Sequence, residues 1–143
     1  MRGADDIGVL SHLEKLLKAP AAGGTATTVF KMHGGTTASD RGALVTRFND
    51  HAGPAAFLMS LRACSQAINL TSATRAVLCE PHWNPMYAAQ AAARCHRIGQ
   101  TRPVEVYRLV CNGTFESKIQ VRDLEVYRLP LRARSRCVTW MPV

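Results

Sequence analysis

Four short apolar runs alternate with stretches of helical periodicity, and this alternation constrains the fold more than any other feature of the sequence. The runs are rich in β-branched, aromatic and aliphatic residues, a composition that is typical of strands. They are TTVFKM (27–32), AAFLMS (55–60), RAVLCE (75–80) and VEVYRLV (104–110). Strands that alternate with helices predict an α/β fold, with a parallel sheet that carries helices on both faces.

Apolar spacing and capping residues predict where the helices lie. The runs 55–60 and 75–80 are predicted to be fully buried strands, because a parallel sheet is covered on both faces. The four helices are expected after a cap at Asp5 or Asp6, after a cap at Ser39 or Asp40, from Asn84 and Pro85 to Gly99, and from about Thr114.

Three polar loops follow strands. They are HGGTT (33–37), RACSQAINLTSAT (62–74) and EPHWNP (80–85). Ligands of open parallel sheets gather at the carboxyl ends of the strands. We therefore expect the three loops to share one edge of the sheet.

Composition narrows the classes of function. The formal charge of +8 favours acidic partners, with nucleic acid first among them, although solubility alone can also explain a basic domain. The five cysteines are odd in number and form no C-x-x-C pair, which argues against a disulfide framework and a thiolate zinc site. We expect no metal site and reduced thiols. The acidic N-terminus predicts no targeting segment, and no apolar run approaches the roughly 18 residues of a membrane span.

The segment QAAARCHRIGQ (90–100) places three polar side chains among alanines. Gln90, Arg94 and Arg97 stand at i, i+4 and i+7, so a continuous helix would carry them on one stripe. Guanidinium groups stay charged and bind phosphate oxygens in a fork. The stripe therefore predicts a phosphate site, and a solvated helix face is the alternative.

The segment FLMSLRACSQAINLTSATRAVLCEPHWNPMYAAQAAARCHRIGQTRPVEVYRLVCNGTFESKI resembles the second RecA-like lobe of the Swi/Snf-type chromatin-remodelling ATPases. These are DNA translocases of helicase-like superfamily two. WNP, QxxxRxHRIGQTRPV and YRLV followed by GTFESKI carry the resemblance, in order and at the family's spacing. It implies a RecA-like helicase C-terminal domain over residues 5–120. The remainder, 121–143, does not resemble the family and is predicted to be a basic irregular tail.

The resemblance implies roles for individual residues. Arg94 and Arg97 match the arginines that reach the phosphates of ATP held by the first lobe, Arg97 being the arginine finger. Gln90 and Gln100 match the glutamines that frame the same motif. Asn69 and Thr71 match a motif that touches the ribose side of ATP and the tracked DNA strand.

A further matching segment lies in HGGTT. Gly34, Gly35 and Thr36 correspond to a turn near the DNA backbone, where glycines allow main-chain amides to approach closely. Ordinary turn chemistry is the alternative for this turn, as it is for Asn69 and Thr71. Trp83 of the WNP segment is predicted to be a buried aromatic anchor.

Three departures from the family affect function. Cys64–Ala67 occupy positions where glycines dominate, which bears on the coupling of ATP to DNA movement. No G-x-x-x-x-G-K-[ST] or D-E-x-H motif occurs, so ATP and Mg²⁺ would be held mainly by a first lobe and neither by this chain alone. The strand that opens the family's second lobe is not found before Asp5, so we expect an open position in the sheet.

Two functions are compatible with these features. One is the C-terminal lobe of an ATP-dependent DNA translocase in the nucleus, acting with a first RecA-like lobe on double-stranded or nucleosomal DNA. It would be inactive as an isolated chain. The other is a non-catalytic basic module that binds DNA or a partner through charge.

Overall fold

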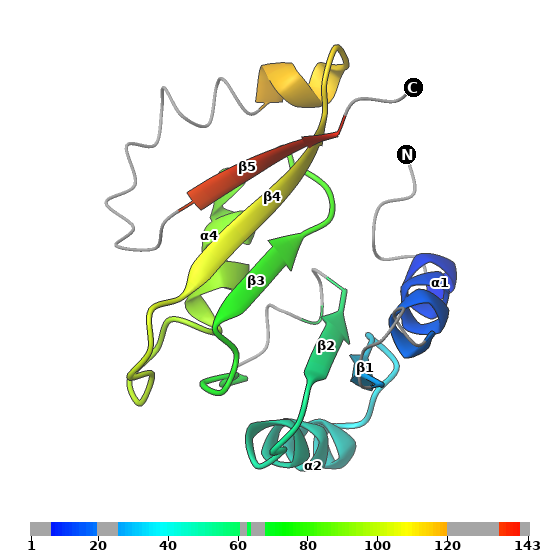
Figure 1. Cartoon of the computed structure of the whole chain (residues 1–143), viewed down its shortest axis with the longest axis vertical. Coiled ribbons are helices and arrows are strands. Elements are labelled where there is room, and N and C mark those ends of the chain that lie inside the picture. The colour runs from blue at the N-terminus through cyan, green and yellow to red at the C-terminus, as the bar shows by residue number, and fades with distance from the viewer. Residues whose placement is uncertain (1–6, 20–25, 61–62, 64–67, 120–134, 141–143) are drawn as a thin grey trace. The chain divides into compact units, whose positions relative to one another are not determined.

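The computed structural model describes residues 7–19, 26–60, 63, 68–119 and 135–140. They belong to two compact units, Met1–Ser72 and Ala73–Val143, each with its own parallel sheet (Figure 1). The predictions for Asp5 and Asp6, for Cys64–Ala67 and for the tail over residues 121–134 and 141–143 lie outside the described residues.

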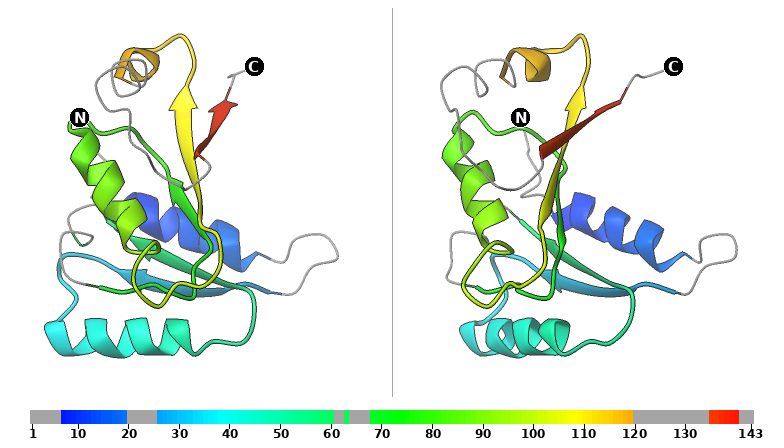
Figure 2. Two further views of the ribbon diagram at one scale, coloured as in Figure 1. Left: turned by 90° about the vertical axis from the view of Figure 1, so that its left-hand side faces the viewer. Right: turned by 60° about the vertical axis from the view of Figure 1, so that its left-hand side comes forward.

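The first unit is a two-stranded sheet between two helices. Strands β1 (Thr28–Met32) and β2 (Ala55–Met59) pair in parallel along their whole length. Helix α1 (Ile7–Lys18) contacts both strands, and helix α2 (Ala38–Asn49) contacts β1. Figure 2 shows the sheet between the two helices, which confirms the predicted helix cover on both faces for this unit.

Three phenylalanines form the core of the first unit. Phe30 and Phe57 stack across the strand pair at 6.4 Å, and Phe48 of α2 meets each ring edge-on at 5.5 and 5.2 Å. Met32 is fully buried beside them, and Leu10 from α1 is 3% exposed. Edge-to-face rings add to the free energy of area burial, so these contacts hold α2 against the sheet.

The second unit contains a three-stranded parallel sheet. Its strands are β3 (Arg75–Leu78), β4 (Glu105–Cys111) and β5 (Ser135–Trp140), in the order β3-β4-β5. Helix α4 (Pro85–Ala93) connects β3 to β4, and residues 115–119 form one further helical turn. Buried valines on alternate positions of β4, Val106 and Val110, form the centre of this core.

Several predictions from the sequence are confirmed. All strand pairs are parallel, and the elements follow the predicted alternation. Asn84 caps α4 and Pro85 is its first residue. None of the described helices is long and apolar enough to cross a membrane.

Three predictions differ from the structure. The cap of α2 is Thr37, not Ser39 or Asp40, because the Thr37 hydroxyl accepts the Asp40 N–H and donates to the Asp40 carboxylate at 2.6 Å. Strands β2 and β3 are half-exposed, since within the described residues each pairs on one side only. Within the described residues the strands form two parallel sheets, one in each unit, and Ser135–Trp140 form β5 inside the segment expected to be irregular.

Candidate functional site

The arginine-bearing segment of the second unit departs from a simple helix. Helix α4 ends at Ala93, so Arg94 is its C-terminal cap and Arg97 lies beyond it. Gln90 is exposed on the helix, but the predicted single helical stripe through Arg97 is wrong. The physical reason is a change of hydrogen bonding at the end of α4. The N–H groups of Arg94 and Cys95 donate to carbonyls three residues earlier, which tightens the backbone into turns.

Gln100 holds the turn that carries Arg97. Its backbone N–H donates to the Arg97 carbonyl at 3.0 Å, after Gly99 reverses the chain with φ 101°. Its side-chain Nε2 donates to the Ala73 carbonyl at 2.8 Å and to the Cys95 carbonyl at 3.4 Å. Its Oε1 accepts the Arg102 N–H at 3.0 Å. The Gln100 carboxamide is therefore committed to backbone groups, and it ties the Arg97 turn to the start of β3.

The Arg97 turn faces solvent. Arg97 is exposed, and its side chain makes no hydrogen bond or ion pair within the described part of the chain. Ile98 beside it is 99% exposed, while Cys95 is buried and burial raises the pKa of its thiol. Arg94 is half-buried. A guanidinium presented this way can bind a phosphate brought by another molecule or domain.

The turn after β1, in the first unit, carries a separate group of candidate residues. The Thr36 N–H donates to the His33 carbonyl at 3.0 Å, and the His33 N–H donates to the Thr36 hydroxyl at 3.1 Å. Arg41 Nη2 donates to the Gly34 carbonyl at 3.2 Å. Gly34 and Gly35 are exposed, and a Cβ on Gly34 would meet no atom within 4 Å. Gly34 therefore leaves the backbone open to a close ligand, whereas the Gly35 N–H donates to His33 Nδ1 at 3.1 Å.

Asn69 and Thr71 lie in a different place from that turn. Helix α2 begins after the carboxyl end of β1 and ends before β2, so Asn49 at its last position lies at the amino edge of the sheet. Asn49 Nδ2 donates to the Asn69 carbonyl at 2.9 Å, which holds the segment at that edge. The prediction that the loops share the carboxyl edge is therefore wrong for Asn69 and Thr71. Because the Gln100 side chain bonds Ala73 just before β3, the Arg97 turn likewise lies at the amino edge of its own sheet.

The structure also corrects the prediction for Trp83. This side chain is 61% exposed, and its ring stacks at 6.3 Å on Phe115, which is 43% exposed. Both follow the carboxyl ends of neighbouring parallel strands, which brings the rings together. Trp83 is therefore an exposed aromatic surface, not a buried anchor. Nothing in the sequence signalled Phe115, because its pairing with Trp83 depends on strand register.

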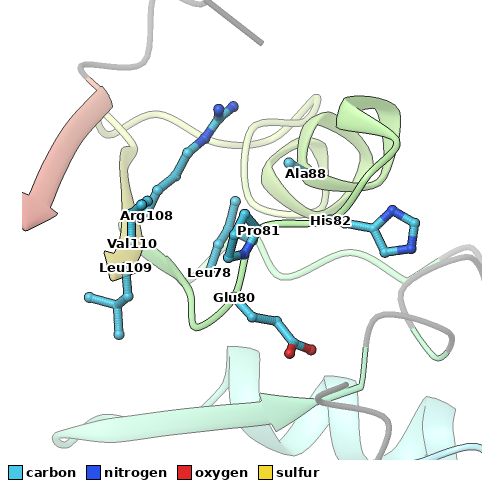
Figure 3. A pocket seen from close by; sticks show the side chains of 8 residues that line it. All are labelled: Leu78, Glu80, Pro81, His82, Ala88, Arg108, Leu109 and Val110. Carbon is cyan, nitrogen blue, oxygen red and sulfur yellow. The ribbon is translucent and has the colours of Figure 1, made fainter. Parts of the chain in front are cut away.

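A small hollow lies where α4 covers the ends of β3 and β4 (Figure 3). Leu78 and Pro81 give it an apolar lining, and the polar ends of Glu80 and His82 point away from these side chains. Its volume of about 20 Å³ has room for roughly one water molecule. The hollow is a packing gap and is too small for a nucleotide.

The chain matches a known family of domains and two curated relatives. The family model "Helicase conserved C-terminal domain" matches residues 7–99. The chain belongs to this family. The chain is 43% identical over 97 residues to the DNA excision repair protein ERCC-6 of Homo sapiens, a match that covers 68% of this chain and 6% of that protein. It is 34% identical over 146 residues to the chromatin-remodeling ATPase INO80 of Aspergillus clavatus, covering 87% of this chain and 9% of that protein.

A solved structure supports the fold. The C-terminal part of the Fun30 ATPase domain matches with a TM-score of 0.63 and 30% identity, over 80% of this chain and 33% of that chain. The resemblance to the second lobe of Swi/Snf-type ATPases, including the RecA-like α/β fold, is confirmed at the level of the family. The chain spans less than a tenth of the length of these two curated relatives.

Proposed function

We propose that this helicase C-terminal domain is the second lobe of a nuclear Swi/Snf-type DNA translocase that acts in chromatin remodelling or repair. A first RecA-like lobe would hold most of the ATP and Mg²⁺, and double-stranded or nucleosomal DNA would be the track. Alone, the chain is expected to hydrolyse no ATP. Relatives named as a chromatin-remodeling ATPase and as a DNA excision repair protein support the proposal.

One observation carries the catalytic half of the proposal. Arg97 is exposed on a turn that Gln100 holds by four hydrogen bonds, beside the fully exposed Ile98. A charged group held on a fixed backbone but with no partner in the described residues is suited to a ligand from outside the chain. Ile98 would be covered by the same approaching surface.

Each candidate residue would have its own contact with the nucleotide or with DNA. Arg97 would act as the arginine finger and stabilise the charge that develops on the transferring phosphoryl group, while Arg94 would bind phosphate oxygens. Gln90 and Asn69 would contact the nucleotide. Gly34, Gly35 and Thr36 would contact the DNA backbone without reading sequence, and Asn69 and Thr71 would contact the tracked DNA strand; the resemblance is the basis of these assignments.

Substitution of Arg97 tests the catalytic role. In a protein that carries this lobe behind its first lobe, Arg97→Ala should lower DNA-stimulated ATP turnover by roughly 10³-fold or more, because the finger acts on the transition state. Arg75→Ala is the matched control, since that arginine is exposed and makes only a 3.8 Å ion pair with Glu105. Turnover that survives Arg97→Ala at the control's level would remove the arginine finger from the proposal.

Two glycines test the DNA contact. Gly34→Ala should weaken binding of the chain to duplex DNA, because the added methyl group would separate the exposed backbone from a phosphate. Gly42→Ala is the control, since neither position has an atom within 4 Å of an added Cβ and neither has a positive φ. Equal DNA affinity of both variants in fluorescence anisotropy would place the DNA contact elsewhere.

A non-catalytic binding module is the second candidate, and a specific surface favours it. The exposed Trp83–Phe115 pair offers a stacking surface on a chain of charge +8. For charge-driven binding, affinity should fall at least about ten-fold between about 50 and about 200 mM salt. DNA binding by the chain with no ATPase activity in a complete two-lobe protein would favour this module over the translocase.

A further inference from the structure

Helix α2 is attached at its first turn to the turn that we assign to DNA. The Thr37 hydroxyl caps the helix, directly after the Gly34–Thr36 turn. One helical turn further on, the guanidinium of Arg41 reaches back and donates to the Gly34 carbonyl at 3.2 Å. A displacement of the Gly34–Thr36 backbone therefore acts directly on the first turn of α2.

The last residue of the same helix holds the segment that carries Asn69. Asn49 Nδ2 donates to the Asn69 carbonyl at 2.9 Å, and Asn49 Oδ1 accepts the Ser72 N–H at 3.2 Å. The Ser72 hydroxyl donates to the Asn49 carbonyl at 2.7 Å. Three hydrogen bonds thus join the end of α2 to residues that lie 20 to 23 positions further along the chain.

Packing fixes which way the Asn69 side chain points. Ile68 and Leu70 are 7% and 4% exposed, whereas Asn69 between them is exposed. The two apolar neighbours hold the segment down, and Asn49 holds its carbonyl. The exposed carboxamide of Asn69 is therefore presented at the amino edge of the sheet in a defined register.

We propose that Asn49 is a positioning residue that links the DNA-side turn, through α2, to the nucleotide-side Asn69. The proposal rests on the function proposed above, which assigns the Gly34–Thr36 turn to DNA and the Asn69 segment to the nucleotide and the tracked DNA strand. The twelve helical residues of α2 span about 18 Å. Phe48, buried one position before Asn49, fixes the helix against the sheet, so the helix moves as a unit.

Amide hydrogen exchange followed by NMR tests the link in the 143-residue chain. Asn49→Ala removes the acceptor of the Ser72 N–H, and exchange at Ser72 should accelerate about five- to ten-fold while the β1–β2 ladder stays protected. Asn112→Ala is the matched control, because that side chain only accepts the neighbouring Gly113 N–H in an exposed turn.

Addition of duplex DNA tests whether Asn49 couples the Gly34–Thr36 turn to the segment of Asn69 and Ser72 or only stabilises the fold. In the wild-type chain, DNA should slow exchange at Gly34–Thr36 and should also change exchange at Ser72. In Asn49→Ala, DNA should still protect the turn, but the Ser72 response should be lost. If Asn49→Ala also loses protection of the β1–β2 ladder, Asn49→Asp is used instead, since it keeps the acceptor for Ser72 and loses only the donor to Asn69.

The outcomes distinguish the two proposals. A wild-type chain that shows no binding of duplex DNA overturns the proposed function, and the link falls with it. Protection of Gly34–Thr36 with no response at Ser72 overturns the link alone. A Ser72 response that persists at full size in Asn49→Ala also overturns it, because the signal would then bypass the carboxamide. In Asn49→Asp, which keeps the acceptor for Ser72, an unchanged response at the Asn69 backbone overturns it.

Discussion

The two units hold their candidate site residues in the same way but with different consequences. In the first unit, the carboxamide of Asn49 donates to one backbone carbonyl and accepts one backbone N–H. In the second, the carboxamide of Gln100 donates to two carbonyls and accepts one N–H. Each of these two carboxamides lies at the amino edge of its sheet. The difference is that Asn49 is the last residue of α2, whereas Gln100 follows a turn that lies beyond the end of α4.

This difference teaches where rigidity comes from in each unit. Asn49 transmits the position of α2, a helix fixed by an aromatic core. The Arg97 turn lies beyond the end of α4, and the four hydrogen bonds of Gln100 hold it. Loss of Gln100 should therefore affect the second unit more than loss of Asn49 affects the first.

The largest expected effect is that of Gln100→Ala. The substitution leaves the part-buried carbonyls of Ala73 and Cys95 without their donor, so the free energy of unfolding should fall by about 1–3 kcal/mol. Urea denaturation of the chain measures it. Gln90→Ala, at an exposed position of α4, is the control and should change stability by no more than a few tenths of a kcal/mol. Equal losses in the free energy of unfolding for both variants would show that the Gln100 side chain does not stabilise the turn.

A smaller effect of opposite sign is expected in α2. Gly42 lies inside this helix, and an added methyl group would meet no atom within 4 Å. Gly42→Ala should raise the free energy of unfolding by about 1 kcal/mol, because alanine loses less backbone entropy in a helix. Thermal unfolding checks this. Gly53→Ala provides the contrast, since its Cβ would lie 3.1 Å from His51 Nε2, and it should bring no such gain.

The smallest effect concerns the ion pairs of a carboxylate on α1. Glu14 bonds Lys18 and Lys31 at 2.7 Å each, and these two hydrogen bonds lower its pKa from 4.5 to about 2. A lowered folded-state pKa contributes stability that is present above 4.5 and is lost as the pH falls through about 2. Glu14→Gln should flatten the decline of the urea midpoint within that window. If the urea midpoint of Glu14→Gln declines as steeply as that of the wild-type chain, other carboxylates cause the decline.

Local patterns predicted much of the fold. The β-branched and aromatic residues of TTVFKM correctly placed β1, and Asn84 with Pro85 correctly placed the start of α4. The cap of α2 was missed because TTASD offers four residues able to cap, and only the paired bonds between Thr37 and Asp40 distinguish them.

The candidate site was harder to predict, because distant contacts shape it. Alanine-rich sequence favours a helix through Arg97, yet Gln100 bonds Ala73, which lies 27 positions earlier. Periodicity carries no information about such a bond. Trp83 was expected to be buried because large aromatic side chains usually are, and its exposure depends on the register that brings Phe115 beside it.

The burial of Cys95 gives the Arg97 turn its own chemical reporter. The residue is 5% exposed, and its carbonyl is one of the groups that Gln100 binds. Alkylation requires the Cys95 thiolate to attack an electrophilic reagent, and the reagent can reach this buried residue only when the turn opens. Cys79 and Cys111 are exposed and offer reference rates within the same molecule. The rate of Cys95 alkylation therefore measures how often the arginine-bearing turn leaves its closed conformation.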